Sequence, residues 1–254
     1  MKVPWKTAWI IGASSGIGRQ LSIDLSNAGV QVAVSARSHS KLLELRKKSK
    51  LLIPFQVDIS DCDAMSDINN KIEMKLGVVD LVVVCAAVWH PMSAKDFDIL
   101  KAKQSFEINV GGVYNVLGSV LPQFIERGKG HIAVVASVAG YRGLPNASVY
   151  GSTKAALINL AESLYPDLAR YGVKLSIVNF GFVDTRMTKG NDFPMPFIMK
   201  PEKASERIIS GLRKSKFEIA FPWRFVLFLK LARILPYPMY FWFVDNFIIR
   251  KLKK

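Results

Sequence analysis

Residues 150–154 place a tyrosine and a lysine at a spacing that could transfer protons. They read Tyr150-Gly151-Ser152-Thr153-Lys154, so Tyr150 and Lys154 are four positions apart and share one helix face. An ammonium group close to a phenol favours the phenolate and lowers a pKa that is otherwise about 10. Thirteen residues earlier, Ser137 ends an apolar run and could hydrogen-bond a substrate oxygen. The set predicts a general acid–base that works near neutral pH.

A glycine-rich turn near the start of the chain could hold a pyrophosphate. Glycines spaced G-x-x-x-G-x-G lie between an expected strand and an expected helix, so the backbone can turn tightly and present N–H groups at a helix N-terminus. The alternative is a strand–helix turn that binds nothing; the position of the turn, at the very start of the chain, favours nucleotide binding. The residues are Gly12, Ser14, Ser15, Gly16, Ile17 and Gly18.

The end of the second expected strand favours NADP over NAD. At this point an acidic side chain usually hydrogen-bonds the free adenosine ribose of NAD. Here Ala36 is followed by Arg37, a cation that could bind a 2′-phosphate together with Ser14. The alternative for Arg37 is a solvated surface arginine. After the third strand, Asp58 could accept a hydrogen bond from the adenine amino group or could simply cap a helix.

Apolar runs that alternate with amphipathic stretches predict the elements that position these residues. Runs such as 81–85 and 131–137 are continuously apolar, as expected where helices cover both faces of a sheet. The alternation predicts an α/β fold with a single doubly wound, Rossmann-type parallel sheet and helices on both faces. We expect strands at 7–11, 30–35, 52–57, 81–85, 131–137, 174–180 and 217–221, and helices at 16–28, 39–48, 61–76, 94–127 (interrupted near 109–112), 148–171 and 201–214.

With these motifs in place, the chain resembles the short-chain dehydrogenase/reductase family from residue 6 to about residue 221. The resemblance implies a catalytic tetrad: Tyr150 exchanges the proton, Lys154 lowers its pKa and holds the nicotinamide ribose, Ser137 orients the carbonyl, and Asn109 holds a proton-relay water. It also implies that Ala86, Gly181, Val183 and Thr185 contact the cofactor. The matching motifs are GASSGIG at 12–18, EINVG at 107–111, VVASVAG at 134–140, YGSTK at 150–154 and GFVDT at 181–185.

Three positions depart from the pattern of that family. Ile11 replaces the usual threonine before the glycine loop, and Phe180 replaces the usual proline before Gly181. Residues 84–87 read Val-Cys-Ala-Ala where Asn-Asn-Ala-Gly is typical, so we expect one side-chain link between strands to be missing. None of the three departures touches the tetrad.

Composition sets the C-terminus apart from the rest of the 254 residues. The chain has a net charge of +15, and residues 221–254 alone hold seven Lys/Arg, one acid and ten of the 27 aromatic residues. We therefore predict a catalytic domain at 1–221 and an amphipathic helical appendage at 222–254, with helices at 223–235 and 239–252 separated by Pro236 and Pro238. The three histidines and two cysteines form no constellation for a metal site or a disulfide framework.

The appendage predicts contact with a membrane surface. Apolar aromatic residues flanked by Lys and Arg are typical of interfacial segments, and no apolar run reaches the length of a span. The alternative is a helical cap or subunit contact in water. Basic residues interleaved with Phe, Trp and Leu argue against nucleic acid. We expect a peripheral or monotopic position on the cytoplasmic side of a membrane, otherwise the cytoplasm, and no signal peptide is visible.

The loop at 187–200 indicates what the protein acts on. It is rich in Met, Phe and Pro, which favours a small lipophilic substrate, although the same makeup would suit packing against the appendage. The leading hypothesis is an NADP(H)-dependent oxidoreductase for a lipophilic carbonyl or alcohol. The alternatives are a soluble oxoacyl-type reductase that uses the C-terminus as an oligomer contact, and a non-catalytic dinucleotide-binding sensor. The family resemblance implies a homo-oligomer.

Overall fold

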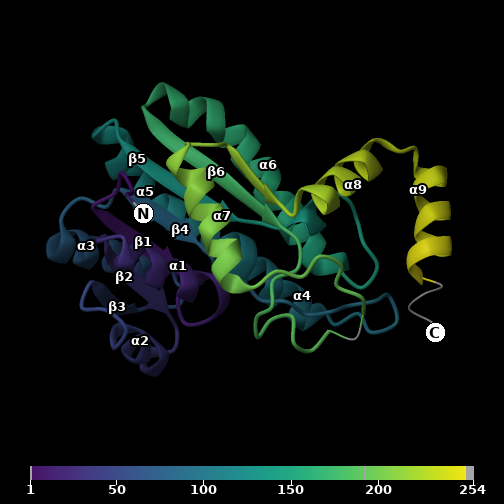
Figure 1. Ribbon diagram of the computed structural model, residues 1–254, viewed down its shortest axis with the longest axis horizontal. Helices are drawn as coiled ribbons and strands as arrows, with labels where there is room; N and C mark the ends of the chain where they lie inside the picture. Colours follow the sequence, from purple (N-terminus) through teal and green to yellow (C-terminus); the bar gives the residue numbers. More distant parts are fainter. Residues whose placement is uncertain (1, 192, 250–254) are drawn as a thin grey trace.

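Seven parallel strands form one sheet in the order β3-β2-β1-β4-β5-β6-β7 (Figure 1). This computed structural model describes residues 2–191 and 193–249. Every residue of β4 and β5 is buried, which is why these strands are apolar apart from His131. The expected doubly wound sheet is confirmed. The strands are β1 (Thr7–Ile11), β2 (Gln31–Ala36), β3 (Leu52–Gln56), β4 (Leu81–Val84), β5 (Gly130–Val135), β6 (Val173–Phe180) and β7 (Glu218–Phe221).

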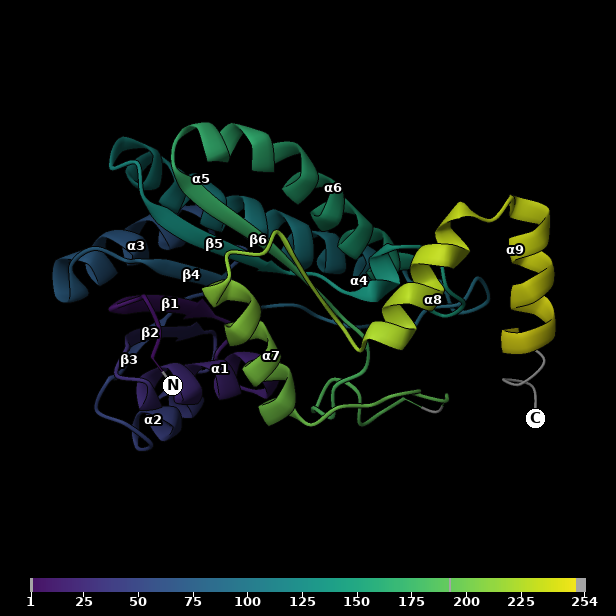
Figure 2. The same ribbon diagram turned by 45° about the horizontal axis from the view of Figure 1, so that its top comes forward.

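Helices cover both faces of the sheet, as Figure 2 shows. Apolar side chains of α3, α5 and α6 pack on one face, and those of α1, α2 and α7 pack on the other. The main helices are α1 (Gly16–Asn27), α2 (His39–Arg46), α3 (Cys62–Leu76), α4 (Ile99–Phe106), α5 (Gly112–Glu126), α6 (Ser148–Arg170), α7 (Pro201–Arg213), α8 (Trp223–Ile234) and α9 (Tyr237–Val244).

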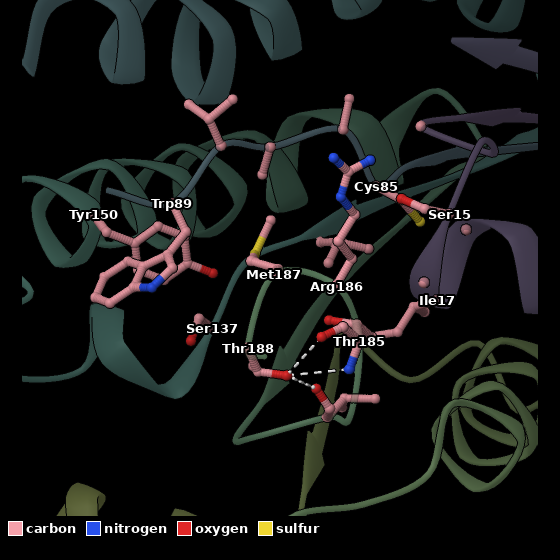
Figure 3. Close-up of a pocket in the computed structure, with 18 of the residues that line it drawn as sticks. Ser15, Ile17, Cys85, Trp89, Ser137, Tyr150, Thr185, Arg186, Met187 and Thr188 are labelled. Carbon is pink, nitrogen blue, oxygen red and sulfur yellow. Dashed lines mark hydrogen bonds between the residues drawn. The ribbon is translucent and has the colours of Figure 1, made fainter. Parts of the chain in front are cut away.

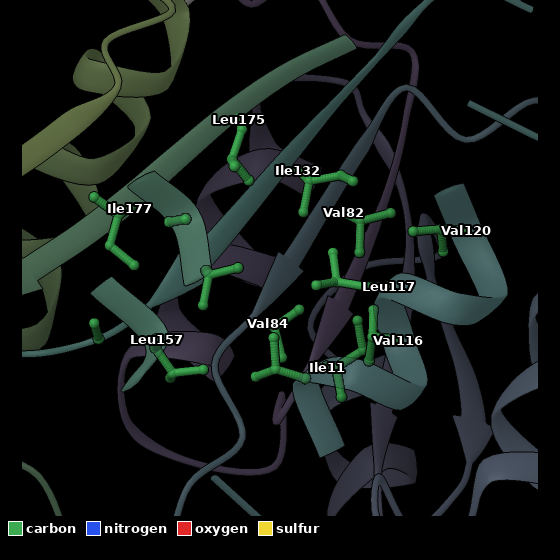
Figure 4. Close-up of a cluster of buried hydrophobic side chains, with 14 of the residues drawn as sticks. Ile11, Val82, Val84, Val116, Leu117, Val120, Ile132, Leu157, Leu175 and Ile177 are labelled. Carbon is green, nitrogen blue, oxygen red and sulfur yellow. The ribbon is translucent and has the colours of Figure 1, made fainter. Parts of the chain in front are cut away.

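The larger buried cluster lies between the central strands and helices α5 and α6 (Figure 4). Ile11 and Val84 come from the carboxyl ends of β1 and β4, and they are 2% and 1% exposed. Leu117 of α5 and Leu157 of α6 close over the same cluster. This packing fixes the carboxyl ends of the strands, where the expected site residues follow.

The expected start of one helix was wrong, and the interruption expected within it is a π-helical turn. The helix expected from Ala94 begins at Ile99, because the Asp98 carboxylate caps it by accepting hydrogen bonds from the N–H groups of Leu100 and Lys101. The interruption expected near Asn109 is a π-helical turn, η1 (Glu107–Gly111), that joins α4 to α5 without a break. Such turns are frequent at functional sites because they displace side chains from the regular helical register.

The C-terminal helices α8 and α9 extend from one end of the molecule, opposite α3 (Figure 1). Val226 and Leu229 of α8 belong to the main buried cluster, so α8 is anchored on the body of the protein. α9 begins at Tyr237, two residues earlier than expected, because Pro238 fits the first helical turn, where no N–H donor is needed. It continues into a π-helical turn, η3 (Asp245–Ile249). The basic end expected at 250–254 lies outside the described residues.

Candidate active site

A cleft of about 460 Å³ runs along the carboxyl ends of the strands, across the point between β1 and β4 where the strand order reverses. Open α/β sheets bind ligands at such a switch point. Of the predicted site residues, all but Asn109 line this cleft. Those that do are Gly12, Ser14, Ser15, Gly16, Ile17, Gly18, Arg37, Asp58, Ala86, Ser137, Tyr150, Lys154, Gly181, Val183 and Thr185.

The glycine loop is packed so closely that two of its glycines have no room for a side chain. Gly12 has φ +90°, and a Cβ there would lie 2.5 Å from the backbone nitrogen of Ala86. A Cβ on Gly18 would lie 2.4 Å from the Gly12 carbonyl oxygen. The loop therefore sits directly against the end of β4, with Ser15 at the N-terminus of α1 facing the cleft. This arrangement presents backbone N–H groups and a positive helix end to an anion.

The cleft ends beyond the glycine loop in a basic corner. Arg37 is exposed there, and its carbonyl oxygen accepts a hydrogen bond of 2.9 Å from the Gln56 side chain. Ser38 and Lys41 line the same end of the cleft. The sequence analysis missed Lys41, although its place four residues after Arg37, in the first turn of α2, was a usable signal.

Asp58 lines the cleft and does not cap the following helix. Its Oδ1 accepts hydrogen bonds from the backbone N–H of Ser60 at 3.0 Å and from the Ser60 hydroxyl at 2.8 Å. The N-cap of α3 is Asp61, whose carboxylate accepts from the Ala64 N–H. Of the two alternatives for Asp58, the helix cap is therefore wrong.

Ser137, Tyr150 and Lys154 meet at the other end of the cleft. Figure 3 shows Ser137 and Tyr150 on the same side of it, with the indole of Trp89 beside Tyr150. The Lys154 ammonium is buried, donates to the Val135 carbonyl oxygen at 2.9 Å and lies 5.5 Å from the centroid of the Tyr150 ring. The Ser137 hydroxyl donates a long hydrogen bond of 3.4 Å to the Phe180 carbonyl oxygen. That weak bond leaves the hydroxyl free to turn toward a ligand oxygen.

The expected lowering of the Tyr150 pKa is wrong for this structure. Desolvation raises the pKa of Tyr150 to about 12, and a hydrogen bond with Ser137 offsets only part of the rise. Burial also lowers the pKa of Lys154 to about 8, against a smaller opposing effect of Cys85. Taking the ammonium out of water weakens its hold on its own proton, so the i, i+4 spacing alone does not decide the pKa of the phenol.

Asn109 is fully buried behind the cleft wall. Its Oδ1 accepts from the Val88 N–H at 2.7 Å, and its Nδ2 donates to the Val88 carbonyl at 3.0 Å and to the Thr153 hydroxyl at 3.2 Å. The side chain thus connects the segment that follows β4 to α6, next to Lys154. The π-helical turn at 107–111 places it there. Its role with a relay water stays a prediction.

The loop after β6 supplies another wall of the cleft. Gly181, Val183 and Thr185 line it, and their contact with a cofactor stays a prediction. The Thr188 hydroxyl donates to the Val183 and Thr185 carbonyl oxygens at 2.8 and 3.0 Å and accepts from the Thr185 N–H at 3.1 Å (Figure 3). Thr188, which sequence analysis did not single out, holds this turn in shape.

Aromatic side chains surround the end of the cleft next to Tyr150. The Trp89 indole meets the Tyr150 ring edge-on, with centroids 5.0 Å apart, and its Nε1 donates to the Asn191 Oδ1 at 3.0 Å. Trp89 therefore connects Tyr150 to the loop that carries Asn191. The other large apolar residues that line this end are Leu144, Phe182, Met187, Phe193 and Phe225.

The family pattern and the relatives that match this chain indicate the same family. The sequence pattern described as "short chain dehydrogenase" matches residues 6–193. An uncharacterized oxidoreductase from Myxococcus xanthus is 34% identical over 243 residues, 94% of this chain and 96% of that protein. One from Staphylococcus epidermidis is 31% identical over 214 residues, 83% of this chain and 92% of that protein.

Solved structures with the same fold include other short-chain dehydrogenases. A short-chain dehydrogenase from Streptomyces avermitilis is 25% identical with a TM-score of 0.81, covering 90% of this chain and 92% of that chain. A short chain dehydrogenase from Burkholderia cenocepacia J2315, determined in complex with NADP, has a TM-score of 0.84 at 19% identity and covers 96% of this chain and 99% of that chain. At that identity the second likeness concerns the fold alone.

Proposed function

Because this chain belongs to the short-chain dehydrogenase/reductase family and is an oxidoreductase of that family, we propose that it interconverts a carbonyl and a hydroxyl on a lipophilic substrate with NADP(H). The membership predicted from the motifs is confirmed, and the fold binds NAD(P). The proposal for a lipophilic substrate depends on one observation. Tyr150 and Ser137 lie at the end of the cleft that aromatic side chains surround, and this end is continuous with the glycine loop.

The residues fit a dinucleotide along the whole cleft. The glycine loop would hold the pyrophosphate, Arg37 and Lys41 the adenosine end, and Lys154 with the turn at 181–185 the nicotinamide end. When bound, the nicotinamide supplies or accepts the hydride. The Tyr150 hydroxyl donates a proton to the carbonyl oxygen during reduction, while the Ser137 hydroxyl donates a hydrogen bond to the same oxygen. A phenol with a pKa of about 12 keeps that proton at neutral pH.

Chain length of the substrate tests the lipophilic assignment. The full-length protein is assayed with NADPH on ketones and aldehydes of increasing alkyl length. Each methylene buried among Trp89, Phe182 and Phe225 contributes about 0.8 kcal/mol, so kcat/KM should rise about fourfold per carbon until the cleft is filled. A preference for short polar oxoacyl groups would contradict the proposal and support the alternative reductase.

The Tyr150→Phe variant tests the acid–base role. Turnover should fall by about 10²–10⁴, because only the proton transfer is lost, while NADPH binding stays intact. Comparable turnover in variant and parent would overturn the role of Tyr150. Tight NADPH binding without turnover of any carbonyl by the parent would point to the sensor alternative.

The basic corner supports NADP(H) as the cofactor. No acid follows Ala36, and Arg37 and Lys41 are placed at the adenosine end of the cleft. A charge-assisted contact contributes about 1.5–3 kcal/mol, so NADPH should be preferred over NADH by about tenfold to a hundredfold. Arg37→Ala should remove most of that preference. Arg46→Ala, at the C-terminal end of α2, is the matched control and should leave the preference unchanged. Equal kcat/KM for both cofactors in the parent would refute this part.

A further inference from the structure

Helix α8 carries two apolar stripes, and only one is covered by protein. Val226, Leu229 and Ala232 are buried against the body of the protein and α9, and Phe225 lines the cleft and stacks with Phe182 at 5.9 Å. A helix that is apolar on opposite sides is normally buried on both. The second stripe of α8 therefore needs an explanation.

The second stripe, here named the outer face of α8, consists of Trp223, Leu227, Leu231 and Ile234. At 3.6 residues per turn these four positions fall within an arc of about 80°. Their exposed fractions are 64%, 50%, 54% and 77%. Tyr237 and Phe241 follow at the start of α9, 66% and 58% exposed. Exposed apolar residues gathered in this way mark a contact surface rather than the scattered exposure normal for a protein surface.

Cations border the outer face of α8 on both sides. In the same helical projection, Arg224 lies on one side of the stripe and Lys230 on the other, with Arg233 next to Lys230. The Lys230 ammonium also pairs with the Glu218 carboxylate. Residues 221–254 hold seven Lys/Arg against one acid. An apolar stripe with a cation on either side matches the boundary between lipid chains and anionic headgroups.

The outer face of α8 is held rigidly to the active-site loop. The Arg142 guanidinium donates to the carbonyl oxygens of Arg233 and Leu235 at 3.1 and 3.3 Å, at the end of α8. It also lies over the rings of Tyr237 and Tyr240, at 4.6 and 4.5 Å from their centroids. The Tyr240 hydroxyl donates to the Gly143 carbonyl oxygen. Arg142 follows Ser137 by five residues, so the appendage and the catalytic loop form one packed unit.

We propose that the outer face of α8 docks the protein on the surface of an anionic lipid bilayer, with α8 lying in the plane of the interface. The opposite side of the same helix lines the cleft through Phe225, so α8 separates the substrate end of the cleft from the lipid. In the described part of the chain, no helix is long and apolar enough to cross a membrane. The contact is therefore in the plane of one leaflet.

A second copy of the chain fits the outer face less well. A two-fold interface places the same patch against itself, so the arginines and lysines beside the stripe would face their own copies. An anionic bilayer offers the opposite charge at the same depth. Docking depends on the exposed stripe and its charges and not on the redox reaction, so vesicle binding and enzyme activity can be tested independently.

Flotation with vesicles tests the proposal. The full-length protein is mixed with phosphatidylcholine vesicles that contain graded phosphatidylglycerol. It should float with the anionic vesicles, and salt should weaken the partitioning. Leu227→Gln with Leu231→Gln should weaken partitioning at least tenfold. The matched control is Met74→Gln with Val78→Gln, two apolar residues that are 88% and 58% exposed in the last turn of α3 and just after it.

Arg224→Glu is an independent second variant, should the double variant fail to fold. It reverses one bordering charge and should reduce flotation only with anionic vesicles. Absence of flotation at every composition, or equal flotation of parent and outer-face variants, would overturn the proposal. A detergent-free dimer that Leu227→Gln with Leu231→Gln turns into a monomer would overturn it as well, because the outer face would then be a subunit contact.

Discussion

The hydrogen bond between Trp89 and Asn191 joins residues 102 positions apart and should determine how well the substrate loop stays closed. Trp89→Phe keeps an aromatic ring beside Tyr150 but removes the Nε1 donor, and Asn191→Ala removes the acceptor. A neutral hydrogen bond contributes about 0.5–1.5 kcal/mol, which corresponds to about twofold to twelvefold in affinity. We expect each variant to raise KM for an apolar carbonyl by that factor while kcat changes less than twofold, because Tyr150, Ser137 and Lys154 are retained.

A double-mutant cycle gives the decisive measurement. Once Trp89→Phe has removed the donor, Asn191→Ala should cost little more, so the coupling free energy should reach about 0.5–1.5 kcal/mol. Protease cleavage within residues 184–199 should accelerate in parallel, because the loop opens more often. Trp223→Phe, on the exposed outer face, and Asn70→Ala, on the exposed side of α3, are the matched controls. Additive effects, or a loss confined to kcat, would refute the reasoning.

Three further outcomes follow from the same geometry. The rate of carbonyl reduction should be nearly independent of pH up to about 8 and should decline above it as Lys154 loses its proton. The rate of alcohol oxidation should rise with pH, because it needs the Tyr150 phenolate and the pKa of Tyr150 is about 12. Parallel pH profiles for the two directions would contradict this prediction. Burial, and to a smaller extent Lys174, lowers the pKa of His131 from about 6.5 in the unfolded chain to about 4. The free energy of unfolding should therefore fall by up to about 3 kcal/mol as the pH drops from 6.5 to 4. Urea denaturation at several pH values should show a smaller fall for His131→Gln. Arg142→Ala should speed hydrogen exchange in α9 by at least tenfold, because two hydrogen bonds and two ring contacts are lost, while exchange in α3 stays unchanged.

Sequence patterns located the parts of the site that depend on local geometry. The glycine loop was readable because a tight turn against β4 leaves no room for a Cβ at Gly12 or Gly18, so only glycine fits. The strands were readable because β4 and β5 are covered on both faces and carry no polar residue apart from His131. The start of α4, by contrast, was expected five residues too early. The Asp98 side chain caps the helix, and the sequence alone does not show which residue near 94–98 makes that contact.

Contacts between distant segments were beyond the reach of those patterns. Nothing local at Trp89 or Asn191 signals their hydrogen bond. The outer face of α8 is a similar case. The composition predicted two apolar helix faces, but only the packing of Val226 and Leu229 determines which stripe is left exposed.

Cys85, which stands in place of the usual asparagine, also has an effect that the sequence patterns did not predict. From the sequence, the change at 84–87 predicted only a lost link between strands. In the structure Cys85 lines the cleft, and desolvation raises its thiol pKa to about 12 against the opposing charge of Lys154. Burial lowers the pKa of Lys154 to about 8, and the interaction with Cys85 opposes only a smaller part of that drop, while the ammonium donates to the Val135 carbonyl oxygen. The pKa of Lys154 thus depends mainly on burial that no four-residue spacing encodes, and to a smaller extent on a residue 69 positions before it. The tetrad motif predicts which groups react, whereas their protonation follows from the fold around them.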